Sequence, residues 1–257
     1  VGAGVCIRSS SDGGNSWQGQ SGGIMQALNY VTYDAAKSQY LYGGGFTQIA
    51  TAPDAPTLTW TTHYPAGANE SYPGIATDGS RYVAVGGDFS TKPISAVARI
   101  STDGGLTWTT QVHPGVNLAL TSVAFGAPKF VAVGPSGTVL NSTDGTSWGA
   151  VTFSPSAPTA NFNRIVFANG TFVAVGNGGI IYTSTDGATF TQQTNANTNN
   201  LFSVARVSGS GGTALWAAVG ANATVLTSAD NGITGSASLA PGPTTLALND
   251  SQSDGTN

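Results

Sequence analysis

The acidic side chains are the residues of this chain best suited to chemistry, and a repeated segment accounts for half of the twelve. Among the remainder, Glu70 and Asp88 are the two that are not expected at turns on the same side of the sheets as the repeat. Two carboxyl groups at a suitable separation can serve as acid and as nucleophile or base in glycoside hydrolysis. The sequence therefore offers one candidate catalytic pair, and two solvated loop acids are the more ordinary explanation of it.

The repeated segment is clearest at residues 101–108, Ser-Thr-Asp-Gly-Gly-Leu-Thr-Trp, and residues 10–17 match it with the same spacing. Residues 142–148 and 184–190 are one position shorter. Two incomplete copies, around Asp54 and Asp230, complete the set. Its acidic position is held by Asp12, Asp54, Asp103, Asp144, Asp186 and Asp230, and its aromatic position by Trp17, Trp60, Trp108, Trp148 and Phe190. Successive aspartates are 42, 49, 41, 42 and 44 residues apart. A period of this length is typical of a propeller.

One unit of the repeat shows how such a blade is built. Apolar runs at residues 164–167, 171–175 and 180–183 are separated by turns rich in Gly, Asn and Asp, and a fourth run begins at 189. Short apolar runs bounded by turn residues predict buried strands. The chain also contains 36 glycines and only 8% charged residues, which favours short strands and tight turns over helices.

The chain ends are expected to close the ring. Residues 244–250 have the pattern of a first strand, and Val1-Gly2 that of the end of a second strand. The sequence therefore predicts an all-β, six-bladed β-propeller with four-stranded antiparallel blades. Its ring is closed by N- and C-terminal strands that share one blade, and residues 1–257 form a single domain.

The repeated segments resemble the Asp-box, also called the bacterial neuraminidase repeat. This motif occurs in sialidases, xyloglucanases, sortilin-type receptors, photosystem assembly factors and many secreted or phage-tail propellers. The resemblance implies a structural role for the box aspartates and aromatics, in the turn between the third and fourth strands. A carboxylate at this position can accept N–H groups of its own turn.

The sialidases of this family need three arginines on a carboxylate, a Tyr–Glu pair and an acid–base Asp. Here Arg8 and Arg99 precede boxes on third strands, and only Arg164 and Arg206 are expected to face a central channel. Sialidase activity is therefore not expected.

The third unit departs from the repeat in its turn between the second and third strands, where residues 87–94 include seven extra positions. The link before this unit is long and aromatic, and the link after it carries His113. Loops on a rigid scaffold often carry function, and aromatic rings beside polar groups suit sugars or peptides. The candidate ligand-binding residues are His63, Tyr64, Glu70, Tyr72, Asp88, Phe89, Lys92 and His113. The alternative is a longer loop that only covers neighbouring blades.

Charge and composition exclude several classes of partner. The net charge of −4 and the lack of a basic stripe argue against nucleic acid. No run reaches the roughly 18 apolar residues of a membrane span. The spacing of His63, His113 and Asp88 matches no metal motif, so neither a metal nor another cofactor is expected. Cys6 is the one cysteine and is expected on a core strand.

The function predicted from these residues is non-catalytic recognition of a glycan or a protein surface. A surface of Thr, Ser, Asn and Gly suggests an extracellular, cell-surface or virion location. Two alternatives stay open: a glycoside hydrolase that uses Glu70 and Asp88, and a structural or assembly-factor propeller bound to neighbouring chains. Fold resemblance does not decide among them.

Overall fold

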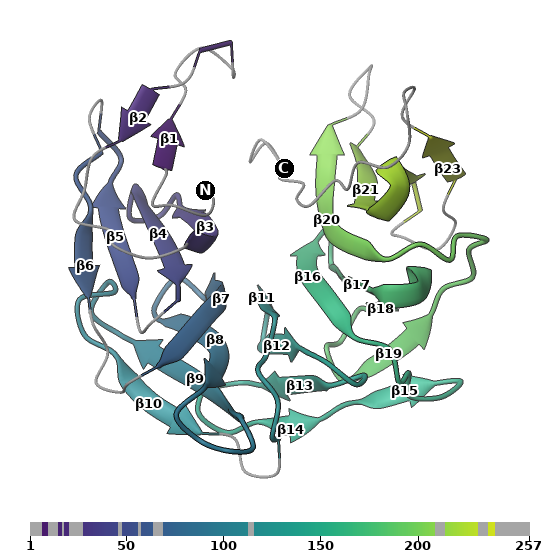
Figure 1. Cartoon of the computed structure of the whole chain (residues 1–257), viewed down its shortest axis with the longest axis horizontal. Helices are drawn as coiled ribbons and strands as arrows, with labels where there is room; N and C mark the ends of the chain where they lie inside the picture. The colour runs from purple at the N-terminus through teal and green to yellow at the C-terminus, as the bar shows by residue number, and fades with distance from the viewer. Residues whose placement is uncertain are drawn as a thin grey trace. The chain divides into compact units, whose positions relative to one another are not determined.

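The computed structural model describes residues 7–9, 15–16, 18–20, 28–45, 48–55, 58–63, 69–112, 116–208, 214–230 and 236–239 (Figure 1). Two compact units divide the chain, residues 1–120 and 121–257. Within the described ranges the secondary structure consists of β-strands and short 3-10 helices. None of the described helices has the length and apolar character needed to span a membrane. The single domain expected over residues 1–257 stays a prediction.

The described residues of the first unit form one strand pair and two four-stranded sheets, each antiparallel and ordered as the chain runs. The pair is β1 (Ile7–Ser9) and β2 (Gln18–Gln20). One sheet is β3 (Leu28–Asp34), β4 (Gln39–Gly44), β5 (Ile49–Pro53) and β6 (Thr61–His63). The other is β7 (Glu70–Thr77), β8 (Tyr82–Asp88), β9 (Ser95–Ser101) and β10 (Thr109–Val112).

The described residues of the second unit form three further sheets, two with four antiparallel strands and one with a fifth strand added in parallel. The first is β11 (Ser122–Gly126), β12 (Lys129–Val133), β13 (Val139–Ser142) and β14 (Gly149–Ala150). The next is β16 (Phe162–Ala168), β17 (Thr171–Gly176), β18 (Ile181–Ser184) and β19 (Thr189–Gln192), to which β15 (Thr152–Ser154) adds in parallel beside β19. The last is β20 (Leu201–Ser208), β21 (Ala214–Gly220), β22 (Thr224–Ser228) and β23 (Ser236–Leu239). Short 3-10 helices η1 (Asn177–Gly179) and η3 (Ala221–Ala223) follow β17 and β21.

The prediction of six blades is wrong, because the described residues form five blade sheets, four with four strands and one to which β15 adds a fifth. The count of six rested on copies of the box, but a box marks only a turn and does not require four strands around it. Around Asp12 the described residues form only the pair β1–β2. The closing strands expected at residues 244–250 and at Val1-Gly2 lie outside the described residues.

The hydrophobic core lies between successive sheets within each unit. In the first unit Leu41 and Ile49 pack against Tyr72 and Ile75 of the next sheet. In the second unit a cluster around Phe190 joins the β11–β14 and β16–β19 sheets. The inner strands face apolar neighbours on both sides, so β17 is buried along its whole length. This explains why these strands are continuous apolar runs and do not alternate.

The box turns are held by their own aspartates. Asp144 Oδ1 accepts the N–H groups of Thr146 and Ser147 at 2.7 and 2.8 Å. Asp186 Oδ1 accepts those of Ala188 and Thr189, both at 2.8 Å. Asp103 follows the same pattern, with Leu106 N–H at 3.1 Å and Thr107 N–H at 2.9 Å.

The aspartates of the two incomplete copies accept side-chain hydroxyl groups. Asp54 Oδ2 accepts the Tyr33 hydroxyl at 2.8 Å, and Asp230 Oδ1 accepts the Ser228 hydroxyl at 2.5 Å. Asp12 and Trp17 lie outside the described residues.

The box aromatics fill space beside their turns. The indole groups of Trp108 and Trp148 donate to Gly105 O and Gly145 O at 2.9 and 3.0 Å. Trp60 packs on Tyr42, with ring centroids 5.1 Å apart, and Phe190 is fully buried.

The box hydrogen bonds predict a loss of stability in acid. The Thr107 hydroxyl and N–H lower the pKa of Asp103 to about 2, and backbone N–H groups lower the pKa values of Asp144 and Asp186. An unfolded aspartate titrates near pH ~3.9, so these carboxylates stabilise the fold above that pH. This contribution is lost as the pH falls from about 4 towards 2.

We expect urea unfolding midpoints to fall over that pH interval, and to fall less in Asp103→Asn, whose side chain does not titrate. An unchanged pH dependence in the variant would contradict the prediction.

A second repeated contact ties each sheet of the second unit to the next. Asn161 Oδ1 accepts Ser136 N–H at 2.9 Å, and Asn200 Oδ1 accepts Gly178 N–H at 2.9 Å. Both asparagines end a link between sheets, and both acceptors hold the turn between the second and third strands of the preceding sheet. The links are therefore fixed to the turns at the end of the sheets opposite the boxes.

Candidate functional site

The last residue of β8 and the loop from β8 to β9 include three of the predicted site residues, Asp88, Phe89 and Lys92. Asp88 Oδ1 accepts the N–H and the hydroxyl of Ser90 at 2.8 and 2.5 Å, which folds the loop back on its own aspartate. Phe89 N–H donates to Asn69 O at 3.0 Å. Although this anchors its backbone, the Phe89 side chain is 48% exposed, and Lys92 is also exposed.

The link that follows β10 reaches the same end of this sheet. Ala96 N–H donates to Val116 O at 3.1 Å, and Leu120 N–H donates to Gly86 O at 3.0 Å. Leu118 lies between these two anchors and is 36% exposed. We call Phe89 and Leu118 the apolar tip. Exposed apolar side chains on a fixed frame are a feature of interaction sites.

Glu70 and Tyr72 belong to a buried cluster below this loop and do not line its surface. Arg99 on β9 donates from Nε to Glu70 Oε2 and from Nη2 to Glu70 Oε1, both at 2.7 Å. The Tyr72 hydroxyl donates to the same carboxylate. Arg99, Glu70 and Tyr72 are 1%, 3% and 0% exposed.

The ionisation of this cluster follows from its geometry. Burial and then the hydrogen bond to Glu70 raise the pKa of the Tyr72 hydroxyl, so it stays protonated. Burial opposes the charge of Arg99, but its bonds to Glu70 and Tyr72 outweigh burial and raise its pKa. The result is a closed, fork-to-fork ion pair.

This arrangement argues against the glycoside hydrolase alternative. Glu70 and Asp88 lie directly opposite each other on β7 and β8. The Glu70 carboxylate is buried and bound to Arg99, while one oxygen of Asp88 is bound to Ser90. A catalytic acid or base must come within hydrogen-bond reach of its substrate. Glu70 has no such access in this structure.

Of the remaining predicted site residues, the structure describes His63. His63 lies half-buried on β6, with Nε2 3.0 Å from Thr51 Oγ1, and burial lowers its pKa. Tyr64 and His113 lie outside the described residues. Across the described ranges, no three His, Cys, Asp or Glu side chains are grouped as metal ligands would be.

Sequence reasoning missed a polar pocket of about 330 Å³ in the second unit. It lies between the turn from β17 to β18 and the link from β19 to β20. Its lining residues are Pro155, Gly178, Gly179, Ile180, Gln192, Gln193, Thr194, Asn195 and Asn197. The available signal was the amide-rich run of residues 192–200, Gln-Gln-Thr-Asn-Ala-Asn-Thr-Asn-Asn. It was missed because this link has an ordinary length.

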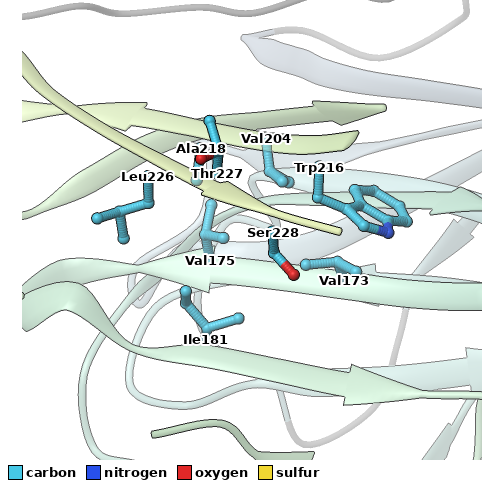
Figure 2. Close-up of a pocket in the computed structure, with 9 residues that line it drawn as sticks. All are labelled: Val173, Val175, Ile181, Val204, Trp216, Ala218, Leu226, Thr227 and Ser228. Atoms are coloured by element: carbon cyan, nitrogen blue, oxygen red, sulfur yellow. The ribbon is translucent and has the colours of Figure 1, made fainter. Parts of the chain in front are cut away.

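A smaller, apolar pocket of about 20 Å³ lies between the last two sheets. Figure 2 shows Val173, Val175 and Ile181 on one side of it, and Val204, Trp216 and Leu226 on the other. These positions correspond to the core around Phe190 in the preceding sheet pair.

The pocket is small and is lined mainly by apolar side chains. Such a volume suits about one water molecule, so this pocket is not a candidate ligand site.

The family comparison supports the propeller fold. A model described as a DUF6242 beta propeller domain matches residues 130–246. No curated protein sequence matches the chain.

Solved structures agree on the fold at low sequence identity. One is described as "YCF48 bound to D1 peptide". It has a TM-score of 0.58 at 12% sequence identity, and the match covers 83% of this chain and 67% of that chain. The WD40 β-propeller domain of Doa1 has a TM-score of 0.61 at 14% identity, covering 89% of this chain and 74% of that one. The RRP9 WD40 repeats have a TM-score of 0.61 at 10% identity, covering 80% of this chain. This chain spans 61% of the RRP9 chain, less than two thirds. Likeness at this identity shows that the chain has a β-propeller fold.

Proposed function

We propose that this β-propeller chain is a non-catalytic recognition module that binds a protein partner through the apolar tip. One observation carries the proposal: Phe89 is 48% exposed although its backbone is anchored to Asn69. Aromatic side chains in the centre of an interface contribute much of its binding energy. A loop that is already fixed in place loses little further conformational entropy on binding.

A protein surface fits this tip better than a glycan. Phe89 offers an exposed aromatic group and Leu118 an exposed aliphatic group, and each suits an apolar pocket of a partner protein. The structures of similar fold include a propeller bound to a peptide, which supports a protein ligand for this chain. We also propose that the repeated turns are of the Asp-box type. We further propose an extracellular, cell-surface or virion location, which is supported by the scarcity of charged residues, 8% of the chain.

The proposal is tested by selecting binders to the whole chain from a displayed protein library and measuring their affinity for two variants. We expect Phe89→Ala to weaken binding by about 2 kcal/mol, or roughly 30-fold. The matched control is Leu106→Ala, since Leu106 is 61% exposed and lies in the box turn at the other end of the same sheet. Equal affinities for wild type and Phe89→Ala would overturn the assignment of the tip.

A further inference from the structure

The polar pocket of the second unit is held open by a fixed frame. Gly179 has φ +75°, and a Cβ placed there would lie 2.1 Å from Asn197 O, so glycine lets the link approach the turn. Asn195 Nδ2 donates to Gly179 O at 3.0 Å, and Asn200 Oδ1 accepts Gly178 N–H at 2.9 Å. The turn and the link are thus joined by hydrogen bonds from both sides.

The asparagines of the pocket are used by the link itself. Asn195 Oδ1 accepts Asn197 N–H at 2.9 Å, and Asn197 Nδ2 donates to Asn199 O at 3.0 Å. The first of these bonds forms an Asx turn, and Asn197 Oδ1 forms another by accepting Asn199 N–H at 3.3 Å, so the backbone of the link is fixed. These bonds leave the two glutamines as the adaptable polar groups of the lining.

Each glutamine has one half of its carboxamide engaged. Gln192 Oε1 accepts the Tyr182 hydroxyl at 3.3 Å, and Gln193 Nε2 donates to Thr183 Oγ1 at 2.7 Å. Among the described residues, the Gln192 NH₂ group and the Gln193 carbonyl oxygen have no hydrogen-bond partner. The pocket therefore offers a donor and an acceptor. A peptide unit carries the complementary pair, one C=O and one N–H.

The lining residues carry no charge and no aromatic ring. A charged side chain would lose hydration on entry without gaining a counterion. A sugar ring would find no aromatic face on which to stack. The volume of about 330 Å³ lies at the lower end of the range for ligand pockets, about 300–1,000 Å³.

We propose that this pocket is a second binding site, separate from the apolar tip, which takes an uncharged, extended polypeptide segment by its backbone. Gln192 donates to a carbonyl of the segment, and the Gln193 carbonyl accepts one of its N–H groups. Since no ionic contact contributes, the affinity is insensitive to salt, unlike that of charged interfaces.

The test measures binding of the whole chain to acetylated, amidated nonapeptides of Asn, Gln, Ser, Thr, Ala and Val by fluorescence polarisation. A matched set carries Lys or Glu at the central position. We expect neutral peptides to bind, a central charge to weaken binding about tenfold, and the Kd to change less than about twofold between 0.05 and 0.5 M NaCl. If none of the neutral peptides binds, the proposal is wrong.

The variant Gln192→Glu makes the test specific. It keeps the oxygen that accepts from Tyr182, removes the free donor and adds a negative charge. We expect neutral peptides to bind about tenfold more weakly, and Lys-centred peptides to bind more tightly than they do to wild type. Gln18→Glu makes the same change at an exposed residue of β2 and should have no effect.

Two further outcomes separate this site from the apolar tip and from a sugar site. Phe89→Ala should leave nonapeptide binding unchanged, and a parallel loss would place the peptides at the tip and overturn the proposal. Neutral oligosaccharides serve as the second probe. If they bind in place of the peptides, with the same sensitivity to Gln192→Glu, the site is a glycan site and the peptide assignment is wrong.

Discussion

Replacing Phe190 with alanine is expected to lower the unfolding free energy of the second unit by about 3–5 kcal/mol. Phe190 is 0% exposed, and its ring lies 6.4 Å from Phe172 and 6.5 Å from Phe153 between centroids. The cavity would open in the core that joins two sheets, where backbone hydrogen bonds restrict collapse. The size of the loss reflects both the missing contacts and the void.

Urea unfolding followed by tryptophan fluorescence and by circular dichroism measures this effect. Thr191→Ala is the control, because Thr191 is exposed on the same strand, β19. A loss below about 1 kcal/mol in Phe190→Ala would show that the core closes around the missing ring. That result would contradict a structural role for the box aromatic in this sheet.

Breaking the Glu70–Arg99 pair is expected to have a similar effect on the first unit. Arg99→Met leaves a buried carboxylate without its cation, and Glu70→Gln leaves a buried guanidinium without its anion. Removal of one partner of a buried ion pair costs about 3–5 kcal/mol. The double variant removes both charges and should recover much of this loss, because neither charge then remains buried alone.

A double-mutant cycle on the four proteins gives the coupling energy directly. Additive losses in the double variant would contradict the ion pair as the source of the effect. Lys92→Met removes a cation at an exposed site on the loop above and should change stability by less than about 0.5 kcal/mol.

Much of the local structure was predictable, because turn chemistry repeats in the sequence. The sequence of residues 163–190 predicts strands at 164–167, 171–175 and 180–183. The strands β16 and β17 cover the first two runs, and β18 covers the third from Ile181 onward. The number of blades was not predictable from the same pattern. A box specifies hydrogen bonds within a few residues, whereas a blade needs four strands to pair over about forty residues.

The site was less predictable, because it depends on burial and on contacts between distant segments. Glu70 was expected on a loop surface, yet its partner Arg99 is 29 residues away and comes to it only through strand pairing. Phe89 could be identified by its place in an extra-long turn. The pocket at Gln192 and Gln193 could not, since its walls come from two segments of ordinary length that meet only in the folded sheets.

The small apolar pocket between the last two sheets has a consequence for the volume of the folded protein. Its lining, shown in Figure 2, leaves a packing gap of about 20 Å³ between side chains, and unfolding removes that gap. Internal voids contribute to the volume decrease of unfolding, and hydrostatic pressure favours the state of smaller volume. Pressure is therefore expected to destabilise the packing between the last two sheets more than the packing between the two sheets joined by Phe190.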